Sequence, residues 1–373
     1  MEVNNNNLYL VSIIIPYFNS RIDFFIQAIE SVLAQSYKKW ETIIVNDGST
    51  VENAKNLTEH IKNLNDKRFR LVNLPKNHGV AFARNTGISE SKGDIIIFLD
   101  ADDLYFPWYL EEIINYFTEI PDLLILSTND IPYLSIGRIK LFNLIRMVTD
   151  VQIRKFVGAK LLEMVKNGKE LLLPRISFKR EVSKKIKYDC EFLCSEDTEF
   201  TFQIISNNDL LEKLIVVPTL GYIYRLHPTR SRLSLQKTKI FKHLKKLRDK
   251  YKVNPIVSSA IKNWELKNDF VRFCQPLSSF FDNASVVGYL KGLFMSKSSF
   301  KEKLKGIRVF SISIIIYNLF IPAFGINYKY IKNLLNAKNN KILFVKEIFE
   351  KHIKSINNEN EKYYASKLFK KIF

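Results

Sequence analysis

The sequence predicts an α/β protein with a mostly parallel sheet that has helices on both faces. Uninterrupted apolar runs rich in β-branched residues, such as Val11–Pro16, alternate with segments whose apolar residues recur at helical spacing. A solid apolar run is typical of a strand buried on both faces, and strand–helix alternation favours parallel pairing. With 373 residues, the chain is long enough for two domains, or for one domain with a large appendage.

The expected elements alternate regularly over the first third of the chain. We expect strands at Val11–Pro16, Thr42–Val45, Phe69–Val72, Ile95–Leu99 and Leu123–Leu126. We expect helices at Asp23–Gln35, Val51–Leu64, after His78-Gly79 through Ser89, and at Pro107–Phe117. The pattern from Ile131 to about Leu193 is less regular and is interpreted as mostly helical. A helical stretch then opens at Glu196-Asp197, and short strands are expected at Val216–Pro218 and Tyr222–Tyr224.

Three polar turns follow strands of the expected sheet: PYFN, NDGST and DADD. In open parallel sheets, ligands bind beyond the carboxyl ends of the strands. Polar side chains from distant parts of the sequence should therefore meet at one edge, which predicts a binding site there.

The stretch DIIIFLDADD places three carboxylates, Asp100, Asp102 and Asp103, at the end of an apolar strand. An unpaired buried carboxylate is costly, and neighbouring carboxylates raise each other's pKa. A divalent cation removes both problems, since Mg²⁺ and Mn²⁺ favour oxygen ligands and are often bound by one or two carboxylates with substrate phosphates. The alternative is a solvated loop of turn-forming aspartates. The position of these aspartates at the binding edge of the sheet favours the metal site over this alternative.

An ordered set of motifs over about residues 10–230 resembles family 2 glycosyltransferases, which are inverting enzymes of GT-A fold. The motifs are IIIPYFN (13–19), QSYKKWE (35–41), IIVNDGST (43–50), NHGVAFARNTGI (77–88), GDIIIFLDADD (93–103) and SEDTEF (195–200). The resemblance implies transfer of a sugar from a nucleotide-diphosphate donor, most commonly a UDP-sugar, to an acceptor hydroxyl, with Mn²⁺ or Mg²⁺ as cofactor.

The resemblance also implies roles for individual residues on the donor side. Pro16 and its neighbours would shape the nucleobase pocket, and Asp47 would contact the base. Arg84 would lie near the donor and balance the aspartates. Asp100 is expected at the ribose or the metal, and Asp102 as the metal ligand that bridges to the diphosphate.

On the acceptor side, Asp197 matches the family's catalytic base, and Glu196 is expected to orient the site. An inverting displacement needs one base on the acceptor hydroxyl, across the sugar from the diphosphate. The alternative for Asp197 is a helix N-cap, since such residues suit a helix start. In YIYRLHPTRSRLS (222–234), Arg225 would meet the diphosphate, and His227 is a candidate metal ligand or an ordinary polar residue.

The net charge of +19 lies entirely in the last third of the chain. Residues 1–235 hold 29 basic and 29 acidic residues, whereas residues 236–373 hold 28 and 9. The segment 309–326 in this part is mostly apolar, and its 18 residues are slightly fewer than the roughly 20 needed to cross a bilayer. The segment 342–356 has an amphipathic helical period. Basic, apolar-faced helices bind anionic bilayers. A helical appendage packed on the catalytic domain and a true membrane span remain alternatives.

These observations predict four parts: a leader (1–9), a nucleotide-sugar-binding half (10–128), an acceptor-binding half with the base (129–235), and a basic helical membrane-associating region (236–373). The N-terminus shows no secretion signal, and the three cysteines form no disulfide framework. We therefore expect a cytoplasmic enzyme, peripheral on the inner face of the cell membrane.

Its expected partners are a nucleotide-sugar donor and a glycan or lipid-linked acceptor of surface-polysaccharide synthesis. No nucleic acid is expected, because the basic part shows no recognisable binding module. Two rival functions remain open: a membrane-bound sugar-nucleotide-binding scaffold without catalysis, and an aspartate-dependent phosphatase.

Overall fold

The computed structural model describes residues 9–136, 139–142, 156–157, 173, 175–193, 195–226, 245–262, 347, 349–356 and 358–372. The chain divides into two compact units. The first comprises Met1–Glu163, Leu172–Asp249 and Ile342–Phe373, and the second Met164–Leu171 and Lys250–Lys341. The strands that the structure describes and the candidate site belong to the first unit. The basic stretch 236–373 is thus shared between the two units.

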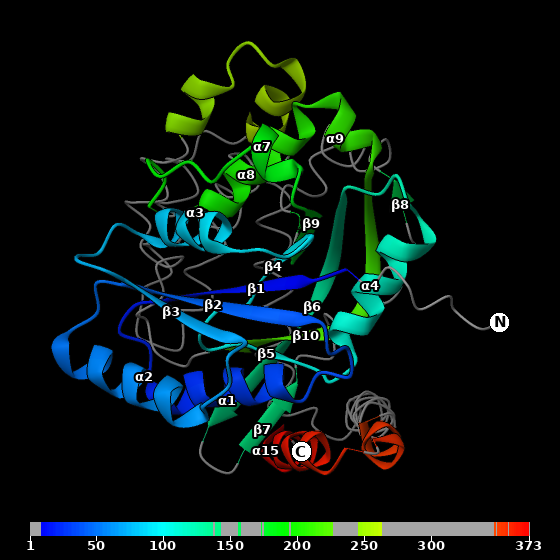
Figure 1. Ribbon diagram of the computed structural model, residues 1–373. Helices are drawn as coiled ribbons and strands as arrows, with labels where there is room; N and C mark the ends of the chain where they lie inside the picture. Colours follow the sequence, from blue (N-terminus) through cyan, green and yellow to red (C-terminus); the bar gives the residue numbers. More distant parts are fainter. Residues whose placement is uncertain are drawn as a thin grey trace, which may run out of the picture. The chain divides into compact units, whose positions relative to one another are not determined.

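Within the described part of the chain, the first unit is built on one sheet of ten strands (Figure 1). The strands are β1 (Val11–Tyr17), β2 (Trp40–Asp47), β3 (Phe69–Leu74), β4 (Ile95–Phe98), β5 (Leu104–Tyr105), β6 (Ile125–Ile136), β7 (Ile139–Phe142), β8 (Phe156–Val157), β9 (Ile176–Lys179) and β10 (Leu214–Leu226). Their order is β3-β2-β1-β4-β9-β6-β10-β5, with β7 paired to β6 and β8 to β10. The first four strands in this order run parallel, as do β6 and β10, whereas β9 is antiparallel to both of its neighbours. The predicted mostly parallel α/β fold is confirmed.

Helices cover both faces of this sheet (Figure 1). They are α1 (Ile22–Leu33), α2 (Val51–Leu64), α3 (Val80–Glu90), α4 (Tyr109–Glu119), α7 (Val182–Lys185), α8 (Glu196–Ile205), α9 (Asn208–Glu212) and α15 (Glu359–Ile372). Alternate residues of β1, such as Ile13 and Ile15, pack with Phe25 and Ile29 of α1 in one extended apolar cluster. On the other face, α3 contacts β1 and β2. The solid apolar runs noted in the sequence are therefore buried from both sides.

The region from Ile131 to about Leu193 differs from its mostly helical interpretation. β6 continues to Ile136 and turns back into β7, and β9 inserts between β4 and β6. The two short strands expected near residues 216 and 222 are one strand, β10, with a register shift between Val217 and Tyr222. These strands pair with partners that are distant in the chain, which a local pattern does not reveal.

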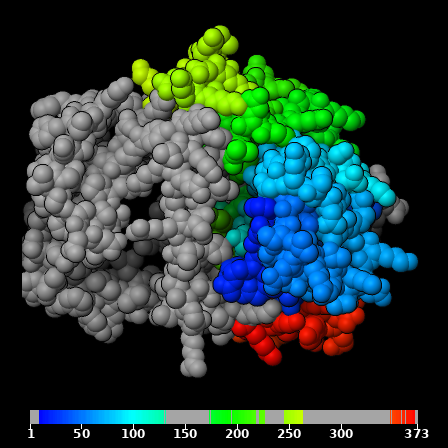
Figure 2. Space-filling view, turned by 90° about the vertical axis from the view of Figure 1, so that its left-hand side faces the viewer, coloured from blue at the N-terminus to red at the C-terminus, as the bar shows by residue number. Residues whose placement is uncertain are grey.

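The last described residues pack on the first unit, where the red C-terminal helix lies against the blue N-terminal part (Figure 2). Phe349 and Leu368 are fully buried and share a cluster with Leu104, Phe106 and other residues. Lys367 Nζ lies 2.7 Å from the buried Glu30 carboxylate of α1. For this segment, the alternative of a helical appendage packed on the catalytic domain is what the structure shows.

The predicted amphipathic helix at 342–356 is helical at the positions described from 347 to 355. Its Phe349 is buried, and Ile353 and Ile356 pack against the same cluster. Protein therefore covers Phe349, and Ile353 and Ile356 are half-buried, whereas membrane attachment of the basic region stays a prediction. Among the described residues no helix is long and apolar enough to cross a membrane. The apolar segment 309–326 lies outside the described residues.

Candidate active site

The site begins where β4 ends. After Leu99 come Asp100, Ala101, Asp102 and Asp103, and then β5. The turn is closed by the Asp103 backbone N–H, which donates to the Asp100 carbonyl oxygen at 3.0 Å. Because β4 runs parallel to β1, this turn lies at the carboxyl edge of the sheet, beside the end of β1.

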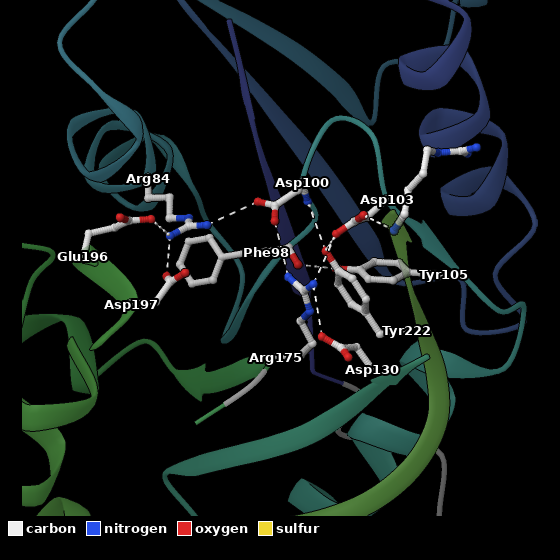
Figure 3. A network of polar contacts seen from close by, with 11 residues as sticks. Arg84, Phe98, Asp100, Asp103, Tyr105, Asp130, Arg175, Glu196, Asp197 and Tyr222 are labelled. Atoms are coloured by element: carbon white, nitrogen blue, oxygen red, sulfur yellow. Dashed lines mark hydrogen bonds and ion pairs between the residues drawn. The ribbon is translucent and has the colours of Figure 1, made fainter. Parts of the chain in front are cut away.

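Arg84 of α3 connects the aspartate turn after β4 with the acidic residues at the start of α8 (Figure 3). Its Nη2 lies 3.2 Å from Asp100 Oδ1, and its Nη1 donates to Glu196 Oε1 at 3.2 Å and to Asp197 Oδ1 at 2.5 Å. The guanidinium also lies 5.2 Å from the ring centre of Tyr188. Burial alone would lower the pKa of Arg84, but the surrounding acidic groups raise it well above its ordinary value. Arg84 is a permanent positive charge between three carboxylates.

A second guanidinium, Arg175, lies on the other side of the aspartate turn, directly before β9 (Figure 3). Its Nη1 donates to Asp100 Oδ2 at 3.3 Å, and its Nη2 lies 3.3 Å from one oxygen each of Asp103 and Asp130. The guanidinium carbon lies 3.9 Å from the ring centre of Tyr222, a cation–π distance. Arg175 thus contacts three carboxylates, two from the turn after β4 and one from within β6.

Both arginines act on Asp100. Burial raises the pKa of this carboxyl, but Arg84 and Arg175 outweigh burial and hold the pKa below its usual value. Each oxygen of Asp100 faces one guanidinium. In the unliganded protein, the charge of Asp100 is therefore compensated by arginine.

Asp103 has a structural role in the turn. It is 1% exposed, and its oxygens accept from the Tyr222 hydroxyl and the Arg225 backbone N–H, both at 2.8 Å. Burial raises the pKa of Asp103 well above its usual value, against the opposing effect of Arg175. These contacts tie the aspartate turn to β10. One of the three clustered aspartates is thus explained by the fold itself.

The two acidic residues at the start of α8 differ in exposure. Glu196 has 11% of its side chain exposed, whereas Asp197 has 46% exposed. Burial first, and the charge of Asp197 second, raise the pKa of Glu196 to about 7. Ser195, not Asp197, is the N-cap residue, and Asp197 lies in the first turn with its side chain on Arg84. The geometry therefore assigns Asp197 to the arginine network and not to the helix cap.

Asp47 organises the loop in front of α3. Its carboxylate accepts from the backbone N–H groups of His78 and Gly79, each at 2.8 Å, and from the Asn77 side chain at 3.0 Å. Asp47 ends β2, and Pro16 of the neighbouring β1 pairs in register with Val45. Both residues therefore lie at the same sheet edge as the aspartate turn.

The structure brings together four of the residues predicted from the sequence: Arg84, Asp100, Glu196 and Asp197. Arg225 joins the same turn from β10, because its Nε donates to the Asp102 carbonyl oxygen at 2.7 Å.

Pro16 and Asp47 lie at neighbouring strand ends, and His227 lies outside the described residues.

Three residues of the network were missed by sequence reasoning: Arg175, Asp130 and Tyr222. Arg175 falls in the stretch from Ile131 to about Leu193 that was interpreted as mostly helical, and Asp130 lies directly before it. The available signal was the short alternating segment ISFK directly after Arg175, which forms β9. Its pairing with β4 and β6 cannot be inferred from the residues around it.

The carboxylates of the turn suit a divalent cation that is also bound by a ligand of the site. Within the described parts of the chain, no three His, Cys, Asp or Glu side chains are grouped to hold a metal ion by themselves. Asp100 and Asp102 offer oxygen ligands, and Asp100 has 31% of its side chain exposed. Magnesium sites of this kind are completed by substrate phosphates. The residues therefore fit a cation that is shared with a bound diphosphate.

The sheet order and the acidic turn at its edge define an α/β protein of the GT-A class. The structure is similar to the mannosyltransferase PcManGT of Pyrobaculum calidifontis, solved in complex with GDP-Man and Mn²⁺. The TM-score is 0.52 at 14% sequence identity, over 85% of this chain and 83% of that protein. At this identity the similarity concerns the fold.

Residues 12–168 match the family model described as glycosyl transferase family 2. This confirms the resemblance noted in the sequence. An uncharacterized glycosyltransferase of Rickettsia bellii is 50% identical over 101 residues, which cover 27% of this chain and 14% of the relative. A putative teichuronic acid biosynthesis glycosyltransferase, TuaG of Bacillus subtilis, is 36% identical over 110 residues, which cover 30% of this chain and 42% of the relative. The chain thus spans less than half the length of these relatives.

Proposed function

We propose that the protein is an inverting, metal-dependent glycosyltransferase. It would move a sugar from a nucleotide-diphosphate donor, with UDP-sugar as our choice, to a hydroxyl of a glycan or lipid-linked acceptor in cell-surface polysaccharide synthesis. The match of residues 12–168 to the family model and the name of the Bacillus subtilis relative support this class and this context.

One observation carries the proposal: Arg84 connects Asp100 of the aspartate turn with Glu196 and Asp197 of α8. A direct displacement at a sugar carbon needs a leaving diphosphate on one side and a base on the other. Asp100 lies on one side of the Arg84 guanidinium, and Glu196 and Asp197 lie on the other (Figure 3). The donor-binding and acceptor-binding groups would therefore be separated by one arginine side chain.

On the donor side, Pro16 and Asp47 would border the nucleobase, and Asp100 the ribose or the cation. Asp102, with Asp100, would hold Mn²⁺ or Mg²⁺ together with the diphosphate, and His227 is a further candidate ligand. When bound, such a cation neutralises the charge that develops on the leaving diphosphate. Arg225 would contribute a second positive charge at the same turn.

On the acceptor side, Asp197 would take the proton of the acceptor hydroxyl. Its side chain is the more exposed of the acidic pair, so an acceptor has access to it. Glu196 is buried against Arg84 and would hold that arginine in place. Geometry comes before pKa in assigning a base, and accessibility favours Asp197.

The function is tested by sugar-nucleotide hydrolysis with Mn²⁺, measured on a panel of donors for the full chain and for Asp197→Asn. We expect turnover by the unchanged protein and a loss of at least about 100-fold in the variant, the usual contribution of a general base. Asp209→Asn is the matched control, because Asp209 is an exposed, ion-paired carboxylate outside the network. A scaffold would show no turnover, and a phosphatase would be insensitive to Asp197→Asn.

We propose further that the protein works at the inner face of the cell membrane, because its last third carries all of its excess positive charge. Each lysine or arginine near an anionic surface adds about 1 kcal/mol of binding. The cluster to test is Lys301, Lys303, Lys305 and Arg308. Its replacement by glutamine should reduce co-sedimentation with phosphatidylserine vesicles at least about tenfold. Unchanged co-sedimentation would contradict membrane attachment through this cluster.

A further inference from the structure

Arg175 has a contact set that the proposed roles of the site residues do not explain. Its guanidinium is shared among Asp100, Asp103 and Asp130, each at 3.3 Å. The side chain is 19% exposed and stacks on Tyr222. An arginine that contacts three carboxylates and an aromatic face is held in one position.

The consequence for Asp100 follows from its two oxygens. Oδ1 faces Arg84 at 3.2 Å and Oδ2 faces Arg175 at 3.3 Å. Arg84 is also paired with the acidic residues of α8. Arg175, by contrast, contacts only carboxylates of the aspartate turn and of β6 among the ion pairs of the described residues. A cation that binds Asp100 must therefore compete with a guanidinium that is already there.

We propose that Arg175 is a positioning residue that supplies the counter-charge of Asp100 in the unliganded protein and competes with a divalent cation for this carboxylate. This rests on the proposed function, in which Asp100 takes part in donor or cation binding. Asp103 and Asp130 would keep Arg175 in place when its pairing with Asp100 weakens. A bound diphosphate would offer Arg175 a new partner, because guanidinium groups pair well with phosphate oxygens.

This competition couples cation and donor. Without nucleotide, the cation must displace Arg175 from Asp100, so its affinity is low. With nucleotide, Arg175 has an alternative partner, and the affinity for the cation rises. By linkage the cation raises the affinity for nucleotide by the same factor.

The test is Mn²⁺ binding to the purified full chain without nucleotide, measured by the loss of the free Mn²⁺ signal in electron paramagnetic resonance. Arg175→Gln should bind Mn²⁺ about tenfold more tightly than the unchanged protein, which corresponds to about 1.4 kcal/mol. Damage to the site lowers affinity, so a gain in affinity separates competition from a merely structural role. Equal or weaker binding by Arg175→Gln would overturn the proposal.

A matched control and a second variant keep the result interpretable. Arg180→Gln removes the same charge at the other end of β9, where Arg180 donates to the Gly93 carbonyl oxygen and the Ser91 hydroxyl, and it should bind Mn²⁺ like the unchanged protein.

If Arg175→Gln does not fold, Arg175→Lys is used. An ammonium is a compact charge without the planar fork that serves several carboxylates at once, so binding should be about two- to fivefold tighter than in the unchanged protein. Unchanged affinity in the lysine variant would likewise overturn the proposal.

A repeat of the titration with saturating UDP tests the coupling. The ratio of Mn²⁺ affinities with and without UDP should fall in Arg175→Gln, because the variant has already lost the competitor. An unchanged ratio would contradict the proposed competition. Failure of the proposed function is separate: it would show as absence of sugar-nucleotide hydrolysis in the unchanged protein, even if Arg175→Gln binds Mn²⁺ more tightly. Hydrolysis without any Mn²⁺ binding in either protein would overturn the inference and leave the transferase class intact.

Discussion

Replacing Glu196 with glutamine is expected to remove a pH dependence of stability that this buried carboxyl imposes on the fold. Burial and the neighbouring Asp197 raise its pKa from 4.5 to about 7. Between these values the folded state keeps a proton that the unfolded state releases. The free energy of unfolding therefore falls as pH rises through this window. A separation from 4.5 to about 7 corresponds to about 3 kcal/mol at high pH.

The assay is urea unfolding of the unchanged protein and of Glu196→Gln at several pH values from 5 to 8, followed by tryptophan fluorescence. Trp40 and Trp108 both lie in the first unit. The stability of the variant relative to the unchanged protein should rise by about 2 kcal/mol from pH 5 to pH 8, since part of the effect is already present at pH 5. Two stability profiles that stay parallel over this range would refute the reasoning.

Glu112 provides a matched comparison outside the arginine network. Burial and the charge of Glu111 raise the pKa of Glu112 to about 7 as well. Glu112 contributes equally to the pH dependence of the free energy of unfolding in the unchanged protein and in Glu196→Gln. Its contribution therefore cancels when the two stability profiles are subtracted. Glu112→Gln should show the same pH effect on stability without altering sugar-nucleotide hydrolysis.

Two further substitutions test the packing that supports the site. Gly48→Ala should lower the free energy of unfolding by at least about 2 kcal/mol, because φ is +66° and a Cβ would lie 2.2 Å from the Lys76 backbone. Gly79→Ala is also strained, with φ of +93°, but its Cβ would meet only the Leu193 side chain at 3.4 Å, so it should cost less; equal losses in urea unfolding would contradict the steric argument. Phe349→Ala should cost about 3 kcal/mol, since the ring is fully buried. The exposed Tyr363→Ala should cost less than about 0.5 kcal/mol, and a small loss for both in thermal unfolding would show that the C-terminal segment does not pack as described.

The parallel half of the fold could be predicted from the sequence because its strands are unmistakable. The run at Ile95–Leu99 is apolar throughout and Val11–Pro16 is interrupted only by Ser12, and the helix expected at Val51–Leu64 has these bounds in the structure. A short apolar run rich in β-branched residues and bounded by turn residues has few interpretations other than a strand buried on both faces. The convergence of polar residues at the carboxyl edge then follows from strand direction alone.

The antiparallel half could not be predicted in the same way. β9 is four residues long, with two buried and two half-buried positions, and its neighbours are β4 and β6. Short mixed segments of this kind carry a weak local signal, and their pairing depends on contacts far along the chain. Arg175 was missed for this reason, since its position is set by β9.

The amphipathic segment 342–356 illustrates a different limit of sequence reasoning. An apolar stripe with lysines on the remaining faces serves equally well against a bilayer or against a protein surface. The sequence establishes the stripe, but only the structure shows that Phe349 packs beside Phe106 and Trp108. The sequence pattern alone does not separate the two interpretations, because a bilayer and a protein surface both favour it.

The docking of α15 on α1 joins an early helix to the last one described. During synthesis, Ala34 and Phe106 leave the ribosome long before Leu368, their partner in one cluster, has been made. Long-range contacts of this kind slow folding and leave apolar surface open to unwanted association. A nascent chain that has completed its sheet would thus still expose this apolar surface, so it should depend on chaperones until α15 has been synthesised and has docked.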